Sequence, residues 1–325
     1  MERHQHPAAA VASKAVRYLI VLFVIMSLNF LLPRLMPGDP VLNILGEEAF
    51  YGPPELLQEL KAEWGLDGPL HEQYLRYLGN YLKGDWGQSF LCMRPVLEAI
   101  SLRLVWTLVL VLPAIVLGAL LATAAGALAA WHRKSRLDIG LSGAFLSLYS
   151  LPHYWLAMVM LFVFGFLLGW FPLGKVATGE TSGLAYVLDV AWHMVLPVTL
   201  LTVSKAAYDF LVVRNSVISI LGEDYVLMAQ AKGLSQMAVL FKHSLRNALA
   251  PLVTVTAMQF GAVLSGTLMV EIVFSWPGMG TMIYEAIGAR DYPVLQGAFF
   301  IIAVCMLAAN FVADMVYVWL DPRTR

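Results

Sequence analysis

Long runs without a charged residue constrain this chain more than any other feature. Five stretches contain no Asp, Glu, Lys or Arg, and a sixth is interrupted only by Lys205 and Asp209. In chain order the six are 18–33, 104–131, 139–174, 190–213, 247–270 and 292–313. A bilayer core about 30 Å thick needs roughly 20 apolar helical residues to cross it. Because lipid cannot satisfy open backbone amides and these runs do not alternate as barrel strands do, we predict an all-α integral membrane protein with six transmembrane helices.

Composition agrees with a membrane setting and excludes several classes of protein. The chain of 325 residues is 59% hydrophobic and 13% charged, against about 25% charged in soluble proteins. A net charge of −1 leaves no excess of positive charge for nucleic acid. Cys92 and Cys305 form neither a disulfide framework nor a metal-ligand cluster, so we expect no metal site.

Catalytic motifs are not found, with one near miss. The stretch 169–175 has the glycine and lysine spacing of a phosphate-binding loop, but Val176 stands where Ser or Thr must bind magnesium. We therefore expect no catalytic residue and no cofactor in this chain.

Lys and Arg gather in alternate loops, which predicts the orientation. The residues concerned are Arg3, Lys14, Arg17, Arg133, Lys134, Arg136, Arg214, Lys232, Lys242, Arg246, Arg323 and Arg325. The opposite side carries the segment 38–100, which has ten acidic and four basic residues. We predict cytoplasmic termini and an uncleaved first span. The expected divisions are 1–37 (N-terminus and helix 1), 38–101 (outer segment), 102–319 (five-helix core) and 320–325 (tail).

The outer segment has helical signals of its own. One run starts at Pro53 and ends before Gly65, and a second follows Pro69 and ends at Gly84. In the second, Tyr74, Leu75, Leu78, Tyr81 and Leu82 recur at helical spacing and predict one apolar face. The segment is a cap over the outer end of the bundle, a docking surface for an outside partner, or both.

Inside the spans, small residues, prolines and one charged pair stand out. Gly118, Ala122, Gly126 and Ala130 recur every four residues and favour close helix packing in lipid. Pro113, Pro152 and Pro197 each lie within a span, where each is a structural kink or a gating hinge. Lys205 and Asp209 lie four apart on one helix face, so they either neutralise each other or serve a cytoplasmic-side gate.

The connection between spans four and five predicts a short helix at about 222–236. Glu223 and Asp224 favour a helix start through the helix dipole, and Gly233 is suited to the residue just past the end. A protruding helix of mixed polarity is suited to docking on a cytoplasmic protein, and the alternative is a linker lying on the membrane.

This stretch resembles the cytoplasmic coupling loop of ABC importer permeases of the dipeptide/oligopeptide/nickel family. Residues 224–234 follow that family's pattern, Asp-Tyr-Val-x-x-Ala-x-Ala-Lys-Gly-Leu. Further similar motifs occur in order along the chain: 37–40 (PGDP), 65–67 (GLD), 84–89 (GDWGQS), 94–96 (RPV), 247–249 (NAL), 270–280 (VEIVFSWPGMG), 290–293 (RDYP) and 320–323 (LDPR). The family usually has Arg where this chain has Leu227 and Gln230, so this helix is less basic than its relatives.

The resemblance implies a type I ABC importer permease: one permease subunit of a larger machine. Its expected partners are a homologous second permease, two cytoplasmic ATPases that bind ATP and magnesium, an extracytoplasmic substrate-binding protein and membrane lipid, in a bacterial or archaeal cytoplasmic membrane. The implied ATPase-coupling residues are Glu223, Asp224, Tyr225, Ala229, Ala231, Lys232, Gly233 and Leu234. The turn at Glu271, Phe274, Trp276, Pro277 and Gly278 is expected to belong to the pathway or outer gate, or to be a structural turn. Peptides are the expected substrate, and nickel or a metal chelate is the alternative.

Overall fold

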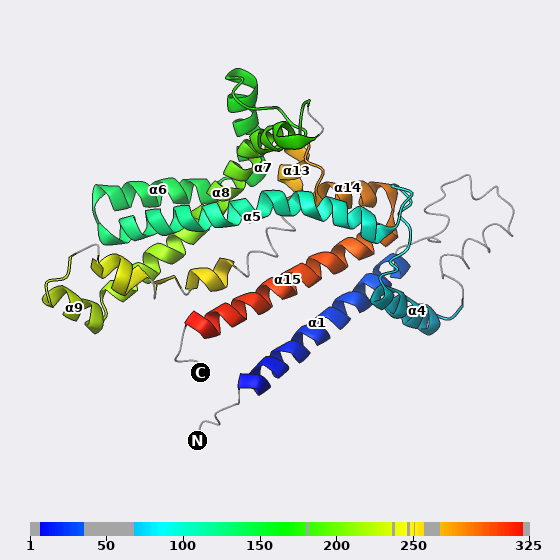
Figure 1. Ribbon diagram of the computed structural model, residues 1–325, viewed down its shortest axis with the longest axis horizontal. Helices are drawn as coiled ribbons and strands as arrows, with labels where there is room; N and C mark the ends of the chain where they lie inside the picture. Colours follow the sequence, from blue (N-terminus) through cyan, green and yellow to red (C-terminus); the bar gives the residue numbers. More distant parts are fainter. Residues whose placement is uncertain are drawn as a thin grey trace. The chain divides into compact units, whose positions relative to one another are not determined.

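The computed structural model describes residues 7–35, 68–179, 182–235, 238–245, 248–249, 251–256 and 267–320 (Figure 1). Most of these residues are helical, and the β-type pairing among them is an isolated bridge between Gln88 and Pro95. The helices are α1 (Pro7–Leu35), α4 (Leu70–Lys83), α5 (Val96–Trp131), α6 (Arg136–Ser150), α7 (His153–Met160), the π-helix η2 (Leu161–Leu167), α8 (Gly183–Leu221), α9 (Asp224–Ala231), the π-helix η3 (Val239–Leu245), α13 (Leu268–Val273), α14 (Met279–Ala289) and α15 (Tyr292–Leu320).

Among the described residues, three helices are long and apolar enough to cross a membrane: Val96–Trp131, Gly183–Leu221 and Tyr292–Val312. A bent pair of helices is a fourth candidate, and Ala15–Leu31 in α1 is a shorter apolar helix. These segments coincide with the predicted spans one to four and six. Half of the predicted fifth span, 247–270, lies outside the described residues, so the count of six stays a prediction.

The predicted third span, 139–174, is not one straight helix. Its two halves, Arg136–Ser150 and His153–Leu167, meet at 101°. Leu151 between them is extended, with φ −83° and ψ 135°, and Pro152 follows it. A proline ring disfavours the helical conformation in the residue before it, which explains why the helix stops there. The chain is therefore bent at Pro152, and whether this bend also acts as a gating hinge stays a prediction.

The chain forms two compact units, and each is described by itself: Met1–Val105 with Gly278–Leu307, and Trp106–Pro277 with Ala308–Arg325. In the first unit, α1 and α15 exchange amide contacts. Asn29 Nδ2 donates to the Gln296 carbonyl at 3.4 Å, and Gln296 Nε2 donates to the Asn29 carbonyl at 3.0 Å. The ring of Tyr81 on α4 stacks against the ring of Trp86, with centroids 5.3 Å apart and planes nearly parallel.

Helix α4 confirms the second predicted helix of the outer segment, but its apolar face is narrower than predicted. Tyr81 is buried, whereas Leu75 and Leu82 are 66% and 87% exposed. At 100° per residue, both leucines lie 80–100° around the helix from Tyr74, beyond the edge of the packed face. The first predicted helix of that segment lies outside the described residues.

The second unit is built on close packing between α5 and α8. A Cβ added at Gly126 would lie 3.0 Å from Val213 Cβ, and one at Gly118 would lie 3.2 Å from the Thr202 carbonyl. Ala122 and Ala130 on the same stripe are also buried. The prediction that this stripe permits close helix approach is therefore confirmed.

Candidate functional site

The observed start and end of α9 agree with the helix signals in its sequence. Glu223 is the extended residue before the helix, and Asp224 supplies a negative charge to the first turn, next to the positive end of the helix dipole. At the other end, Gly233 has φ +76°. The Gly233 amide donates to the Gln230 carbonyl at 2.9 Å and the Leu234 amide to the Ala229 carbonyl at 3.4 Å. These two bonds form a Schellman ending, which needs a left-handed residue and therefore favours glycine.

Two side chains pack α9 against the rest of the second unit. Val226 is fully buried and Ala229 is 5% exposed, three residues apart on one helix face. They pack with buried Val239 of η3 in a cluster that Trp131 (end of α5), Ile220 and Leu221 (end of α8) complete. A shift of α9 must therefore press on the ends of α5, α8 and η3 together.

The other residues of α9 and those that flank it form an exposed surface. Tyr225, Leu227 and Met228 are 40%, 48% and 60% exposed, and Leu234 is 43% exposed. Glu223, Asp224, Gln230, Ala231, Lys232 and Gly233 are exposed as well. Of the eight predicted residues, Ala229 alone is buried. Leu227 and Gln230, which replace the family's arginines, belong to this surface, so the departure from the family pattern changes an accessible face.

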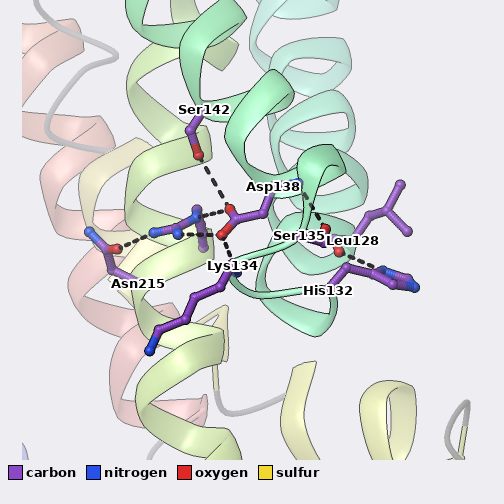
Figure 2. Close-up of polar contacts among 8 residues, drawn as sticks. Leu128, His132, Lys134, Ser135, Asp138, Ser142 and Asn215 are labelled. Atoms are coloured by element: carbon purple, nitrogen blue, oxygen red, sulfur yellow. Dashed lines mark hydrogen bonds and ion pairs between the residues drawn. The ribbon is translucent and has the colours of Figure 1, made fainter.

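The structure contains an ion pair that was not predicted, between Asp138 of α6 and Arg214 of α8. Asp138 starts α6 and is 3% exposed. Arg214 of α8 donates to both its carboxylate oxygens, from Nε at 2.6 Å and Nη2 at 2.8 Å (Figure 2). The Lys134 amide donates to the same carboxylate at 2.9 Å, and the Ser142 hydroxyl does so at 3.4 Å. The Asp138 amide in turn donates to Ser135 Oγ at 3.3 Å, which caps the helix.

One sequence signal could have found Asp138, and none could have found its partner. Ser135-x-x-Asp138 has the spacing of a helix-capping motif. Arg214 lies 76 residues away on another helix, and the sequence showed it only as one of several basic residues in the loops.

The charged pair within α8 is buried. Lys205 and Asp209 are 7% and 0% exposed. The Lys205 ammonium donates to the Asp209 carboxylate and also to Thr256 Oγ1, at 3.3 Å. An i, i+4 pair of opposite charge limits the cost of burying each group in an apolar setting. Whether it also serves a gate stays a prediction.

The turn that follows α13 is packed inside the chain's own core. Thr107 Oγ1 donates to Glu271 Oε1 at 2.8 Å, and Trp276 Nε1 donates to the Trp106 carbonyl at 2.9 Å. Glu271 and Trp276 are fully buried and Phe274 is 3% exposed. Pro277 is half-buried, and Gly278, in the other unit, is the residue before α14. The exposed members of this turn are Ile272 and Ser275 instead.

The predicted residues thus fall into three local groups with different neighbours: α9 on η3 and the ends of α5 and α8, Lys205–Asp209 beside Thr256, and the 271–276 turn on α5. In the part of the chain that the structure describes, no group of three or more His, Cys, Asp or Glu could hold a metal ion.

Comparison with known proteins identifies the family. Residues 114–325 match the family described as binding-protein-dependent transport system inner membrane component, and residues 10–111 match the N-terminal region of such components. The chain is 35% identical over 319 residues to the di/tripeptide transport system permease protein DppB of Pseudomonas aeruginosa (strain UCBPP-PA14), covering 93% of this chain and 94% of that protein.

Two further relatives are similar over nearly their whole length. The oligopeptide transport system permease protein AppB of Bacillus subtilis (strain 168) is 33% identical over 318 residues, or 97% of this chain and 99% of that protein. The glutathione transport system permease protein GsiC of Escherichia coli (strain K12) is 35% identical over 309 residues, or 94% of each.

Together with the apolar helices, these matches describe a multi-pass protein of the cytoplasmic membrane. It is a transport subunit rather than an enzyme, and it works with partner subunits such as ATPases and a substrate-binding protein. The chain therefore belongs to the binding-protein-dependent transport system inner membrane components, as an ABC importer permease of the peptide family.

Proposed function

We propose that this permease imports di- or oligopeptides, pairing with a homologous second permease to form the pathway and drawing energy from two cytoplasmic ATPases. The observation that carries the proposal is similarity over at least 93% of the chain to permeases named for di/tripeptides, oligopeptides and glutathione. ATP and magnesium then belong to the ATPases, and substrate is delivered by an outside binding protein.

In this proposal α9 is the point where an ATPase docks. Its exposed surface joins apolar side chains (Tyr225, Leu227, Met228, Leu234) to charged ones (Glu223, Asp224, Lys232), a mixture suited to a protein interface. Val226 and Ala229 attach this surface to the ends of α5 and α8, so force applied to α9 reaches the spanning helices directly. A cytoplasmic location of α9 and both termini is part of the proposal, and it is supported by basic residues near α9 such as Arg214, at the end of α8, and Lys232.

The 271–278 turn is proposed to belong to the outer gate, as a rigid element. Its hydrogen bonds through Glu271 and Trp276 hold its shape from inside, and Ile272 and Ser275 are the side chains that it presents outward. Glu271, Phe274 and Trp276 then support the gate without lining the pathway.

Reconstitution tests the proposed function. The permease, its second permease, both ATPases and the binding protein are placed in proteoliposomes, and ATP-dependent uptake of labelled di-, tri- and pentapeptides is compared with uptake of nickel. We expect at least one peptide to be taken up and nickel not to be. Uptake of nickel without any peptide would replace this proposal with the metal alternative.

A further inference from the structure

The Asp138–Arg214 ion pair joins two helices that meet at the end of the second unit where α9 is attached. The carboxylate of Asp138, in the first turn of α6 (Figure 2), pairs with the guanidinium of Arg214 on α8. The two side chains are 4% and 22% exposed. Two parallel N–H···O bonds fix the relative orientation of the helices, which a single contact does not.

The contacts form a continuous path from α9 to α6. Val226 and Ala229 of α9 pack with Ile220 and Leu221, which end α8. Arg214 lies seven residues before Leu221, or about two helical turns. Trp131, in the same cluster as α9, ends α5 and leads through the turn 132–135 into α6. Helix α6 is therefore connected to the support of α9 twice, once by the chain and once by the ion pair.

Aromatic and alanine side chains make further contacts between α6 and α8. Phe145 and Phe210 stack with planes 10° apart and centroids 4.4 Å apart, and small Ala206 and Ala207 lie in the same apolar cluster. Such apolar contacts hold the helices together through many weak dispersion attractions. The ion pair is directional, and the Asp138 carboxylate also holds the Lys134 amide of the turn, where Lys134 has φ +65°.

We propose that Asp138 and Arg214 are positioning residues for energy coupling, which make α6 move with α8 when α9 is displaced. The inference rests on the proposed docking of an ATPase on α9. Without the pair, α9 would still dock and its displacement would still reach the end of α8, but α6 would slip against α8 and substrate movement per ATP would fall.

Four variants of the complete transporter test this role, and one of them is the conservative change Arg214→Lys. Asp138→Asn keeps the size of the side chain and an acceptor for the Lys134 amide but removes the charge, and Arg214→Gln removes the other partner. Ser135→Ala is the matched control, because it removes the cap at the start of the same helix and leaves the ion pair in place. In proteoliposomes, ATP hydrolysis and substrate uptake are measured together, and the amount of ATPase that co-purifies with the permease is recorded.

We expect Asp138→Asn and Arg214→Gln to retain the ATPase and to lower substrate moved per ATP about tenfold, within the range for residues that link two sites. Ser135→Ala should keep the wild-type ratio, and Arg214→Lys, which retains the charge without the two-point contact, should recover part of it. A wild-type ratio in the two charge variants would overturn the inference, even if less complex assembles, since that is the outcome for a purely structural pair. Failure of the wild-type permease to bind any ATPase would instead overturn the proposed function.

Discussion

Gly233 offers a sharp test of the coupling helix, because conformation and bulk predict different outcomes there. Its φ of +76° is a left-handed conformation, and a Cβ added to it would meet no atom within 4 Å. Size alone should therefore be tolerated in this chain. We therefore expect that a substitution at 233 uncouples ATP hydrolysis from transport in proportion to the free-energy cost of the left-handed backbone, not to the size of the side chain.

The magnitudes follow from that cost. A left-handed conformation costs an ordinary L-residue about 1–2 kcal/mol, least for Asn, and is a true outlier for β-branched residues. We expect Gly233→Ala to weaken the capped ending of α9 by about 1 kcal/mol, roughly fivefold in its population, and Gly233→Val by about 2 kcal/mol, roughly thirtyfold. Gly233→Asn, although larger than Ala, should cost only a few tenths of a kcal/mol.

The assay is substrate uptake per ATP hydrolysed in proteoliposomes containing the whole transporter. The ratio should decrease in the order Gly, Asn, Ala, Val at position 233, while the amount of assembled complex stays constant. If Asn and Val lower the ratio equally, bulk at a contact with the ATPase is the cause, and the conformational reasoning is refuted.

Three further perturbations have defined outcomes. Met228→Asp, at a 60% exposed site on α9, should reduce co-purification of the ATPase at least tenfold, because a charge must be desolvated at the interface, whereas membrane insertion stays normal. Asp291→Ala should lower the free energy of unfolding by about 3 kcal/mol, because buried Asp291 accepts hydrogen bonds from Ser89 Oγ at 2.7 Å and from the Leu91 amide at 3.0 Å. The control Ser101→Ala, at an exposed hydroxyl, should leave this free energy unchanged, and thermal unfolding in detergent measures both. Burial raises the pKa of Tyr77 from 10.0 to about 12, so the unfolded chain loses this proton first and the free energy of unfolding should fall as pH rises from 10 to 12. In denaturant titrations, Tyr77→Phe should remove that part of the pH dependence. An unchanged dependence would contradict the assignment.

The charged pairs show how far sequence reasoning reaches. Lys205 and Asp209 are four residues apart, so helix geometry alone places them on one face, and the structure has them in contact. Asp138 and Arg214 are joined only through the packing of α6 on α8, which depends on the path of the chain between them. The sequence therefore showed Arg214 as a loop charge that sets orientation, and its ion pair with Asp138 was missed.

The prolines within the predicted spans show a similar limit. Pro113 and Pro197 lie inside the continuous helices α5 and α8, whereas the helix stops before Pro152. All three prolines lack the amide and disfavour a helical residue before them. What differs is the surroundings of each proline, and Pro197 is buried. That depends on packing partners, which no local pattern records.

The length of α8 has a mechanical consequence. Its 39 residues rise 1.5 Å each, giving about 58 Å, well beyond the roughly 45 Å of a bilayer with its headgroups. Such a rod must either lean or project into water. If it pivots near its middle, a lean of about 10° displaces each end by about 5 Å in opposite directions. A single helix that tilts in this way would narrow the pathway at one side of the membrane while widening it at the other. Two separately timed gates would then be unnecessary.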